Sequence, residues 1–229
     1  MKYEIKGAPM PVVHVCLDRD ESIICESGGM CYMSNNMDMK TTTNGGIGKV
    51  FSRLFSGEKL FQNIYTAKNK DGYIAFASSF PGDIRALEVD ASHQYIVQKS
   101  CFLAGSQDIQ LSINFQKKFS SGLFGGEGFI MQNISGNGIC FIEIDGSPIE
   151  FTLGPGEQVV ANTGHLVMME NTCTMEIKTV GGAKNMFLGG EGFFNTVITG
   201  PGKVILQTMP ISKMATTLTP YLPITNGNN

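Results

Sequence analysis

The chain has 229 residues, of which 42% are hydrophobic and 16% are charged, with 28 glycines, 13 methionines and no tryptophan. This composition excludes an intrinsically disordered chain, because disorder combines low hydrophobicity with high net charge. The balance of 17 Lys and Arg against 20 Asp and Glu gives a net charge of −3, so no overall field attracts nucleic acid or an anionic membrane surface.

The first residues, 1–7, contain no apolar run that would form the core of a signal peptide. No window approaches the roughly 18 to 20 uninterrupted apolar residues that a membrane-spanning helix needs. We therefore expect a cytoplasmic protein with reduced cysteines. None of the six cysteines forms a Cys-x-x-Cys pair, and we expect them to be small buried hydrophobes. They are Cys16, Cys25, Cys31, Cys101, Cys140 and Cys173.

One segment, near residues 46–56, has the periodicity of an amphipathic helix. Its apolar stripe consists of Ile47, Val50, Phe51, Leu54 and Phe55. Two interpretations stay open: the helix covers an end of its own β core, or it contacts another subunit, a partner protein or a membrane. The flanking glycines favour the outward role, because they allow the segment to hinge. Membrane contact is the weaker version, since Lys49, Arg53 and Lys59 supply little electrostatic attraction.

A short Gly-Glu motif directly follows this segment and recurs twice more along the chain, at intervals of roughly 65 residues. The three copies are Gly57-Glu58, Gly126-Glu127 and Gly190-Glu191. The favoured interpretation is structural: each glutamate accepts backbone N–H bonds and fixes the entry to a strand. The alternative is that the three carboxylates meet at a pseudo-threefold axis and bind Mg²⁺ or Ca²⁺. We assign no metal site.

The remaining sequence has the period of β-strands. Apolar and polar residues alternate over 111–116, 149–153 and 175–179, and glycine-rich turns separate such runs. Many short strands at regular spacing predict an all-β domain of the sandwich or barrel kind. We predict a single domain of three repeats, at about 3–82, 83–146 and 147–222, followed by a frayed tail at 223–229.

The threefold signature at 56–61, 125–130 and 189–194, with Gly-Pro-Gly at 200–202 and Pro-Gly-Glu at 155–157, resembles the altered-inheritance-of-mitochondria family. The resemblance extends over about residues 3–222. It implies a fold similar to that of the tryptophan RNA-binding attenuator protein, a type of double-stranded β-helix, and no established enzymatic activity. Fungal relatives are linked to organisation of the mitochondrial inner membrane. Without a visible targeting peptide, we do not carry that setting over.

Catalytic motifs are weak in this sequence. His14, His93 and His165 are far apart, no Gly-x-Ser-x-Gly elbow is present, and the glycine-rich loops lack the Lys-Ser/Thr of phosphate loops. The only basic doublet is Lys117-Lys118, which disfavours nucleic-acid binding. We therefore predict a non-catalytic scaffold or protein-interaction protein that self-associates and holds no cofactor. The alternative is a binding module for RNA, a small polyanion or a metal ion.

Overall fold

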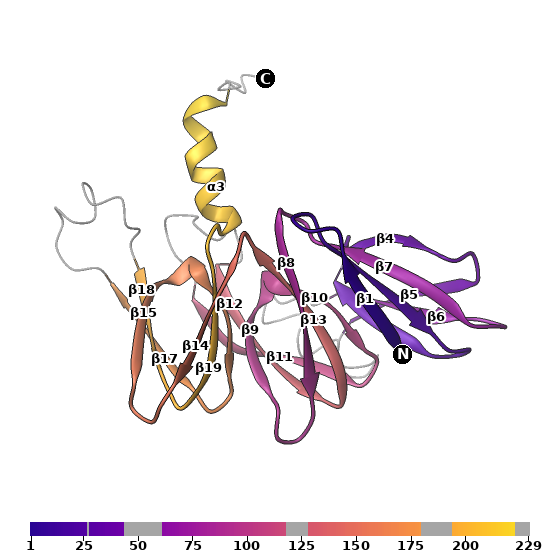
Figure 1. The fold of residues 1–229 in the computed structure, drawn as a ribbon, viewed down its shortest axis with the longest axis horizontal. Coiled ribbons are helices and arrows are strands. Elements are labelled where there is room, and N and C mark those ends of the chain that lie inside the picture. Colours follow the sequence, from indigo (N-terminus) through magenta and orange to yellow (C-terminus); the bar gives the residue numbers. More distant parts are fainter. Residues whose placement is uncertain (27, 44–60, 118–127, 180–193, 223–229) are drawn as a thin grey trace.

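The structure is a computed structural model, and it describes residues 1–26, 28–43, 61–117, 128–179 and 194–222 (Figure 1). Several of the sequence predictions lie outside these residues. They are the helix at 46–56, the three Gly-Glu pairs at 57–58, 126–127 and 190–191, and the frayed tail at 223–229.

Strands dominate the described residues, which confirms the all-β class (Figure 1). The first seven strands are β1 (Lys2–Lys6), β2 (Val12–Leu17), β3 (Ser22–Glu26), β4 (Met30–Met33), β5 (Met37–Thr43), β6 (Phe61–Ala67) and β7 (Gly72–Ala77). The next six are β8 (Gly82–Val89), β9 (Tyr95–Gln98), β10 (Phe102–Ser106), β11 (Ile109–Lys117), β12 (Phe129–Gly136) and β13 (Gly138–Asp145). The last six are β14 (Pro148–Leu153), β15 (Gln158–Asn162), β16 (Leu166–Glu170), β17 (Thr174–Thr179), β18 (Phe194–Thr199) and β19 (Gly202–Gln207).

These strands form four antiparallel sheets. Three successive sets of six strands, β2–β7, β8–β13 and β14–β19, have the same arrangement within these sheets, and β1 is added at the edge of the first sheet. The first sheet has the order β1-β2-β7-β4, the second β5-β6-β3-β10-β13-β8, the third β11-β12-β9-β16-β19-β14, and the fourth β15-β18-β17. Each set of six strands therefore contributes three strands to one sheet and three to the next. The sets are joined by two strand pairs, β3 with β10 and β9 with β16.

Even an irregularity recurs in this arrangement. The pairings of β4 with β7, β10 with β13, and β16 with β19 each contain one register shift at the same place. The shift lies between Met30 and Tyr32, between Phe102 and Ala104, and between Leu166 and Met168, respectively. This common register relates every position of β4 to one position in β10 and one in β16. The predicted repeat boundaries at 3–82, 83–146 and 147–222 stay a prediction, to which the pairing adds support.

Successive sheets pack face to face through three clusters of buried apolar side chains. One cluster joins the first and second sheets through residues such as Ile74 and Phe141, and another joins the second and third sheets through Cys140 and Ile205. The third cluster joins the third and fourth sheets and includes Ile198. The two inner sheets therefore have apolar contacts on both faces. The first and fourth sheets each have one face without such a cluster among the described residues.

A C-terminal helix, α3 (Ile211–Leu218), projects from the body of strands (Figure 1). This helix was not predicted from the sequence. Three short 3₁₀ turns are also present: η1 (Lys99–Cys101), η2 (Thr163–His165) and η3 (Thr219–Tyr221). Within the described ranges, α3 is the only α-helix.

Candidate interaction surfaces

Strand β4 presents an apolar edge to solvent. All four of its residues are exposed, and Tyr32 is 41% exposed. One edge of β4 pairs with β7, whereas no strand of the described residues pairs with the other edge. The strands with the same register, β10 and β16, have four buried residues out of five each. The exposure of β4 therefore comes from its position at the end of the array and not from its own composition.

Strand β15 presents the second such edge. Its residues alternate between the two faces of the fourth sheet. Val159 and Ala161 pack into the apolar cluster between the third and fourth sheets, and Val160 points to the other face. Val160 is 60% exposed, the largest exposed fraction of any valine or isoleucine among the exposed large hydrophobic residues. Its partner strand is β18, and within the described residues its other edge is unpaired.

A polar and aromatic cluster lies beside the free edge of β4, on the outer face of the first sheet. Nδ1 of His14 is 3.1 Å from the hydroxyl of Tyr32, and its Nε2 is 3.6 Å from Sγ of Cys16. The ring of Tyr73 lies 5.4 Å from the ring of His14. A thiol beside an imidazole is the pair used by cysteine nucleophiles. Here the same imidazole also holds Tyr32 through its other nitrogen, so we interpret the cluster as a support that positions Tyr32 at the edge.

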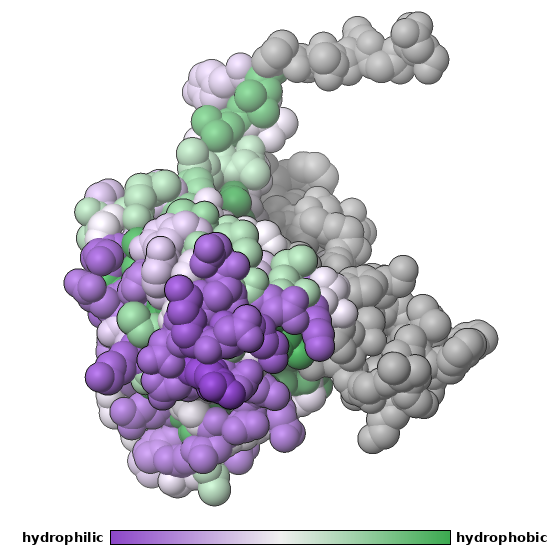
Figure 2. All heavy atoms as spheres, turned by 90° about the vertical axis from the view of Figure 1, so that its right-hand side faces the viewer, coloured by the Kyte–Doolittle hydropathy of each residue, from purple (hydrophilic) through white to green (hydrophobic). Residues whose placement is uncertain are grey.

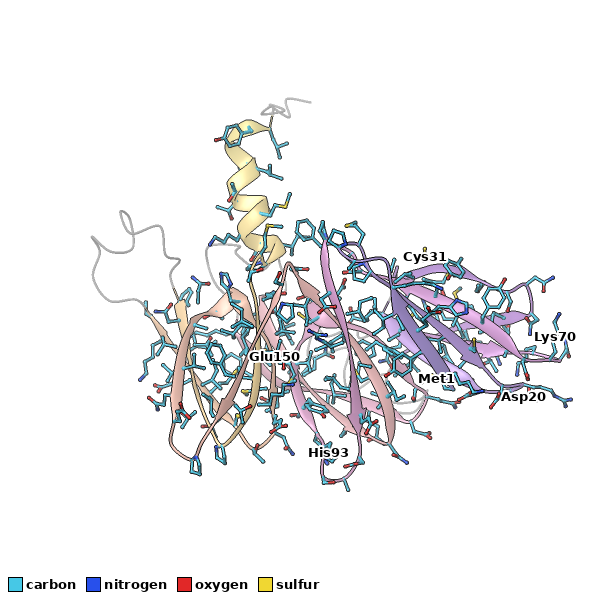
Figure 3. The ribbon with its side chains drawn as sticks, viewed as in Figure 1. Met1, Asp20, Cys31, Lys70, His93 and Glu150 are labelled. Carbon is cyan, nitrogen blue, oxygen red and sulfur yellow. The ribbon has the colours of Figure 1, made fainter. Side chains whose placement is uncertain are left out.

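His93 belongs to an exposed turn and not to a catalytic triad (Figure 3). Its Nδ1 lies 2.9 Å from Asp90, and the hydroxyl of Ser92 donates to the same carboxylate at 2.8 Å. Serine and histidine therefore both bind aspartate, whereas a triad needs the serine to bind the histidine. These hydrogen bonds hold the pKa of Asp90 well below its ordinary value, and the carboxylate in turn raises the pKa of His93.

Glu143 is a buried carboxylate whose hydrogen bonds connect two parts of the fold. It accepts hydrogen bonds from the backbone N–H of Ser79 at 2.6 Å and from the hydroxyls of Ser78 and Ser79 at 3.1 and 3.3 Å. Burial raises the pKa of Glu143, and the serine donors offset part of this effect. Glu143 lies on β13, whereas both serines lie in the connection between β7 and β8. Its hydrogen bonds therefore tie that connection to the second sheet.

All six cysteines are free in the structure, as predicted. Cys25, Cys101, Cys140 and Cys173 are buried, and burial raises the pKa of the Cys25 thiol to about 12. Cys16 and Cys31 are exposed, so the prediction that the cysteines are buried hydrophobes is wrong for these two. Both lie in the first sheet, and Cys31 lies on β4 itself (Figure 3).

The helix α3 carries a third apolar surface. No residue of the helix is buried, and hydrophobic side chains lie along it where it leaves the body (Figure 2). Its start is fixed by Pro210 at the N-cap and by a 2.9 Å hydrogen bond from the Ile211 N–H to Asp145. Its apolar stripe repeats at intervals of three and four residues. The stripe consists of Ile211, Met214, Ala215 and Leu218.

The candidate residues from the sequence contribute little to these surfaces. The Gly-Glu pairs and the helical stripe lie outside the described residues. The three histidines have separate partners: His14 contacts Tyr32, His93 contacts Asp90, and His165 contacts the backbone carbonyl of Gln207. Over the described ranges, no group of three or more His, Cys, Asp or Glu side chains has an arrangement that would hold a metal ion. Sequence reasoning missed the His14 cluster because its members lie on three different strands.

Residues 3–209 match the family described as "Mitochondrial biogenesis AIM24". This chain belongs to the AIM24 family. The altered-inheritance-of-mitochondria resemblance is thereby confirmed over nearly the whole chain.

Relatives of this AIM24 protein occur in Streptococcus pyogenes. One uncharacterised protein of that organism is 30% identical over 237 residues, which cover 99% of this chain and 93% of the relative. A crystal structure of a protein from Streptococcus pyogenes superposes with a TM-score of 0.80 at 26% identity, covering 96% of this chain and 99% of that one. The likeness therefore includes the whole array of sheets. Among the described residues of the AIM24 protein, no helix combines the length and apolarity needed to cross a membrane.

Proposed function

We propose that this AIM24 protein is a non-catalytic cytoplasmic scaffold that works by association, in the first place with further copies of itself. One observation carries the proposal. The apolar strand β4 is exposed along its length, although strands of the same register elsewhere in the chain are buried. Exposed, uncharged strand edges pair with other strands unless the protein blocks them.

The proposed absence of catalysis is supported by what the polar side chains do. Glu143 anchors a loop, Asp90 organises a turn around His93, and His14 holds Tyr32 beside an edge. Each constellation has a structural use in the fold. The cytoplasmic location is supported by the six free cysteines, because reducing compartments keep thiols from pairing.

The test is the size of the purified protein in solution. Sedimentation velocity across a hundredfold range of concentration is expected to give species that are multiples of 24.8 kDa. A chain that stays at 24.8 kDa throughout would contradict self-association.

The same preparation tests the alternative of a binding module. Elemental analysis and the ratio of absorbance at 260 and 280 nm report bound metal and nucleic acid. Stoichiometric metal or RNA would favour the binding module over the scaffold. We expect neither, since the net charge of −3 disfavours RNA and no group of His, Cys, Asp or Glu side chains in the described ranges has an arrangement that would hold a metal ion.

A further inference from the structure

The eight strand edges that terminate the four sheets are not alike. Six of the edge strands contain charged residues, which discourage pairing with foreign strands. These six are β1, β5, β8, β11, β14 and β17. The other two, β4 with the sequence Met-Cys-Tyr-Met and β15 with Gln-Val-Val-Ala-Asn, contain none. The same is true of β9 and β10, which take part in the strand pairs β9–β16 and β3–β10 that join the sets (the internal joints), whereas their partners β16 and β3 each end in one glutamate. By composition, β4 and β15 therefore resemble β9 and β10.

The two internal joints have the same register. In the first joint, Ala104 and Gly105 lie opposite Cys25 and Ile24. In the second joint, the residues with the same register, Met168 and Met169, lie opposite Val97 and Ile96. The counterparts of Ala104 and Gly105 in β4 are Tyr32 and Met33, as the shared register shift shows. The counterparts of Cys25 and Ile24 in β15 are Ala161 and Val160, because their partners in β6 and β18 correspond.

At the equivalent positions of these joints, the burial of a side chain depends on its place in the array of sheets and not on its residue type. Ile24 and Ile96 are 4% and 7% exposed, because each inserts into the cluster between its own sheet and the next sheet of the array. Val160 occupies the same place in the fourth sheet, where no further sheet follows, and is 60% exposed. On the other side of the joint, Leu103 and Val167 are buried in the same way, whereas Cys31 is exposed.

We propose that β4 of one copy pairs antiparallel with β15 of a second copy, in the register of the internal joints. Tyr32 then lies opposite Ala161, Met33 opposite Val160, and Ser34 opposite Val159. The pairing unites the first sheet of one copy with the fourth sheet of the other into one sheet of seven strands. Val160 of the second copy then faces the cluster between the first and second sheets of the copy that supplies β4. The inference rests on the proposed self-association and identifies the surface and the partner.

The joint is heterologous, because it uses two different edges of the chain. Figure 1 places β4 and β15 at opposite ends of the array, so each copy binds one neighbour at each end. Repetition of such a contact gives a closed ring if the rotation closes, and a filament if it does not. A symmetric dimer through two β4 strands is a different arrangement and is excluded by the proposal.

The test is a cysteine pair across the joint. Met33→Cys and Val160→Cys are introduced into a background with Cys16→Ser and Cys31→Val, where valine is the residue that β16 carries at the position of Cys31. Directly opposite residues have Cα atoms about 4.5 to 5.5 Å apart, within the range of a disulfide. Oxidation of the double variant is expected to give a ladder of covalent multimers on a non-reducing gel.

Matched variants test the register of the pairing between β4 and β15 and show that the two strands come from different copies. Met33→Cys with Gln158→Cys places the second thiol on the same face but two residues away, about 6.6 Å along the strand, and is expected to cross-link at least tenfold less. Mixing single-cysteine variants at 33 and 160 is expected to give dimers only. Self-cross-linking of either single variant, equal cross-linking by the Gln158 control, or a disulfide confined to one chain would each overturn the inference.

A second experiment distinguishes failure of the proposed joint from failure of the proposed function. Val160→Lys adds a charge at an exposed position, so the melting temperature of the monomer should stay unchanged while the mass falls to 24.8 kDa. If the background protein never assembles, both the proposed function and the joint are wrong. If it assembles and Val160→Lys still assembles to the same size, the scaffold role stands and the joint is wrong.

Discussion

At the scale of single residues, the turn around Asp90 makes a direct prediction. The carboxylate of Asp90 lies 2.9 Å from the imidazole of His93 and raises its pKa, chiefly by hydrogen bonding. Asp90→Asn is therefore expected to lower the pKa of His93 toward the ordinary value of 6.5. An NMR titration of the imidazole signals measures the change. Because the folded pKa is raised, any stability from this pair is present below pH 6.5 and is lost as the pH rises through the raised pKa.

Asp108→Asn is the matched control, since Asp108 is also an exposed carboxylate in a turn. It should leave the His93 titration unchanged. A His93 pKa that is the same in the wild type and in Asp90→Asn would refute the assignment.

The buried carboxyl group of Glu143 is predicted to make the free energy of unfolding fall as the pH rises, which is the opposite of the effect of a salt-bridged acid. Its folded pKa is raised by burial, so the folded state binds a proton more readily than the unfolded state. Its contribution to stability is present below about pH 4.5 and is lost as the pH rises through the raised pKa. Glu143→Gln removes this titration. Urea unfolding at several pH values should show a smaller fall in stability with rising pH in the variant.

Asp145 also has a pKa raised by burial and stays in both proteins, so the difference between them reports Glu143 together with its interaction with Asp145. Glu143→Ala is a harsher change, because it removes the acceptor that the Ser79 N–H and two serine hydroxyls share. It should cost about 1–3 kcal/mol of unfolding free energy. Identical pH profiles for the wild type and Glu143→Gln would contradict the prediction.

At the scale of elements, α3 is predicted to be dispensable for the fold. No residue of the helix is buried, and its hydrogen bond to the body runs from Ile211 to Asp145. A chain truncated after Pro210 should therefore lose at most about 1 kcal/mol of stability, the value of one ordinary hydrogen bond. Thermal unfolding of the truncated and full chains measures this. A fall of more than about 10 °C in melting temperature would mean that α3 packs on the body.

Strands were easier to predict from the sequence than helices. Alternation over 111–116, 149–153 and 175–179 predicted β11, β14 and β17, because a strand with one buried face leaves that pattern. The helix α3 also has a pattern, at Ile211, Met214, Ala215 and Leu218, but only two turns of it. So short a stripe is weak evidence beside a chain of strand signals.

The candidate surfaces were not predictable in the same way. β4 has no alternation, since all its residues are apolar or aromatic, and its sequence is equally suited to a buried strand such as β16. Whether such a strand is covered depends on which strand lies next to it, and that is a property of the whole array. The contact of His14 with Tyr32 likewise needs the pairing of β2, β7 and β4.

At the scale of the whole molecule, the sheets couple the three sets of strands. The second and third sheets each take strands from two sets, and the apolar clusters lie between sheets and not within one set. Loss of one joint therefore exposes the clusters on both sides of it. We expect the described sheets to unfold as one cooperative unit.

The last prediction compares one substitution at two positions that share a register but differ in burial. Met168 lies in the joint between β9 and β16 and is 1% exposed, whereas Tyr32 lies on the free edge of β4. In a Val160→Lys background, which by the proposal is monomeric, Met168→Asp places a charge in the cluster between the second and third sheets. It should cost about 3–5 kcal/mol or prevent folding. Tyr32→Asp loses the hydrogen bond to His14 and the ring contacts with His14 and Tyr73, all at the surface, and should cost about 1–2 kcal/mol. Urea unfolding compares the two, and equal costs would mean that β4 is already covered within a single chain.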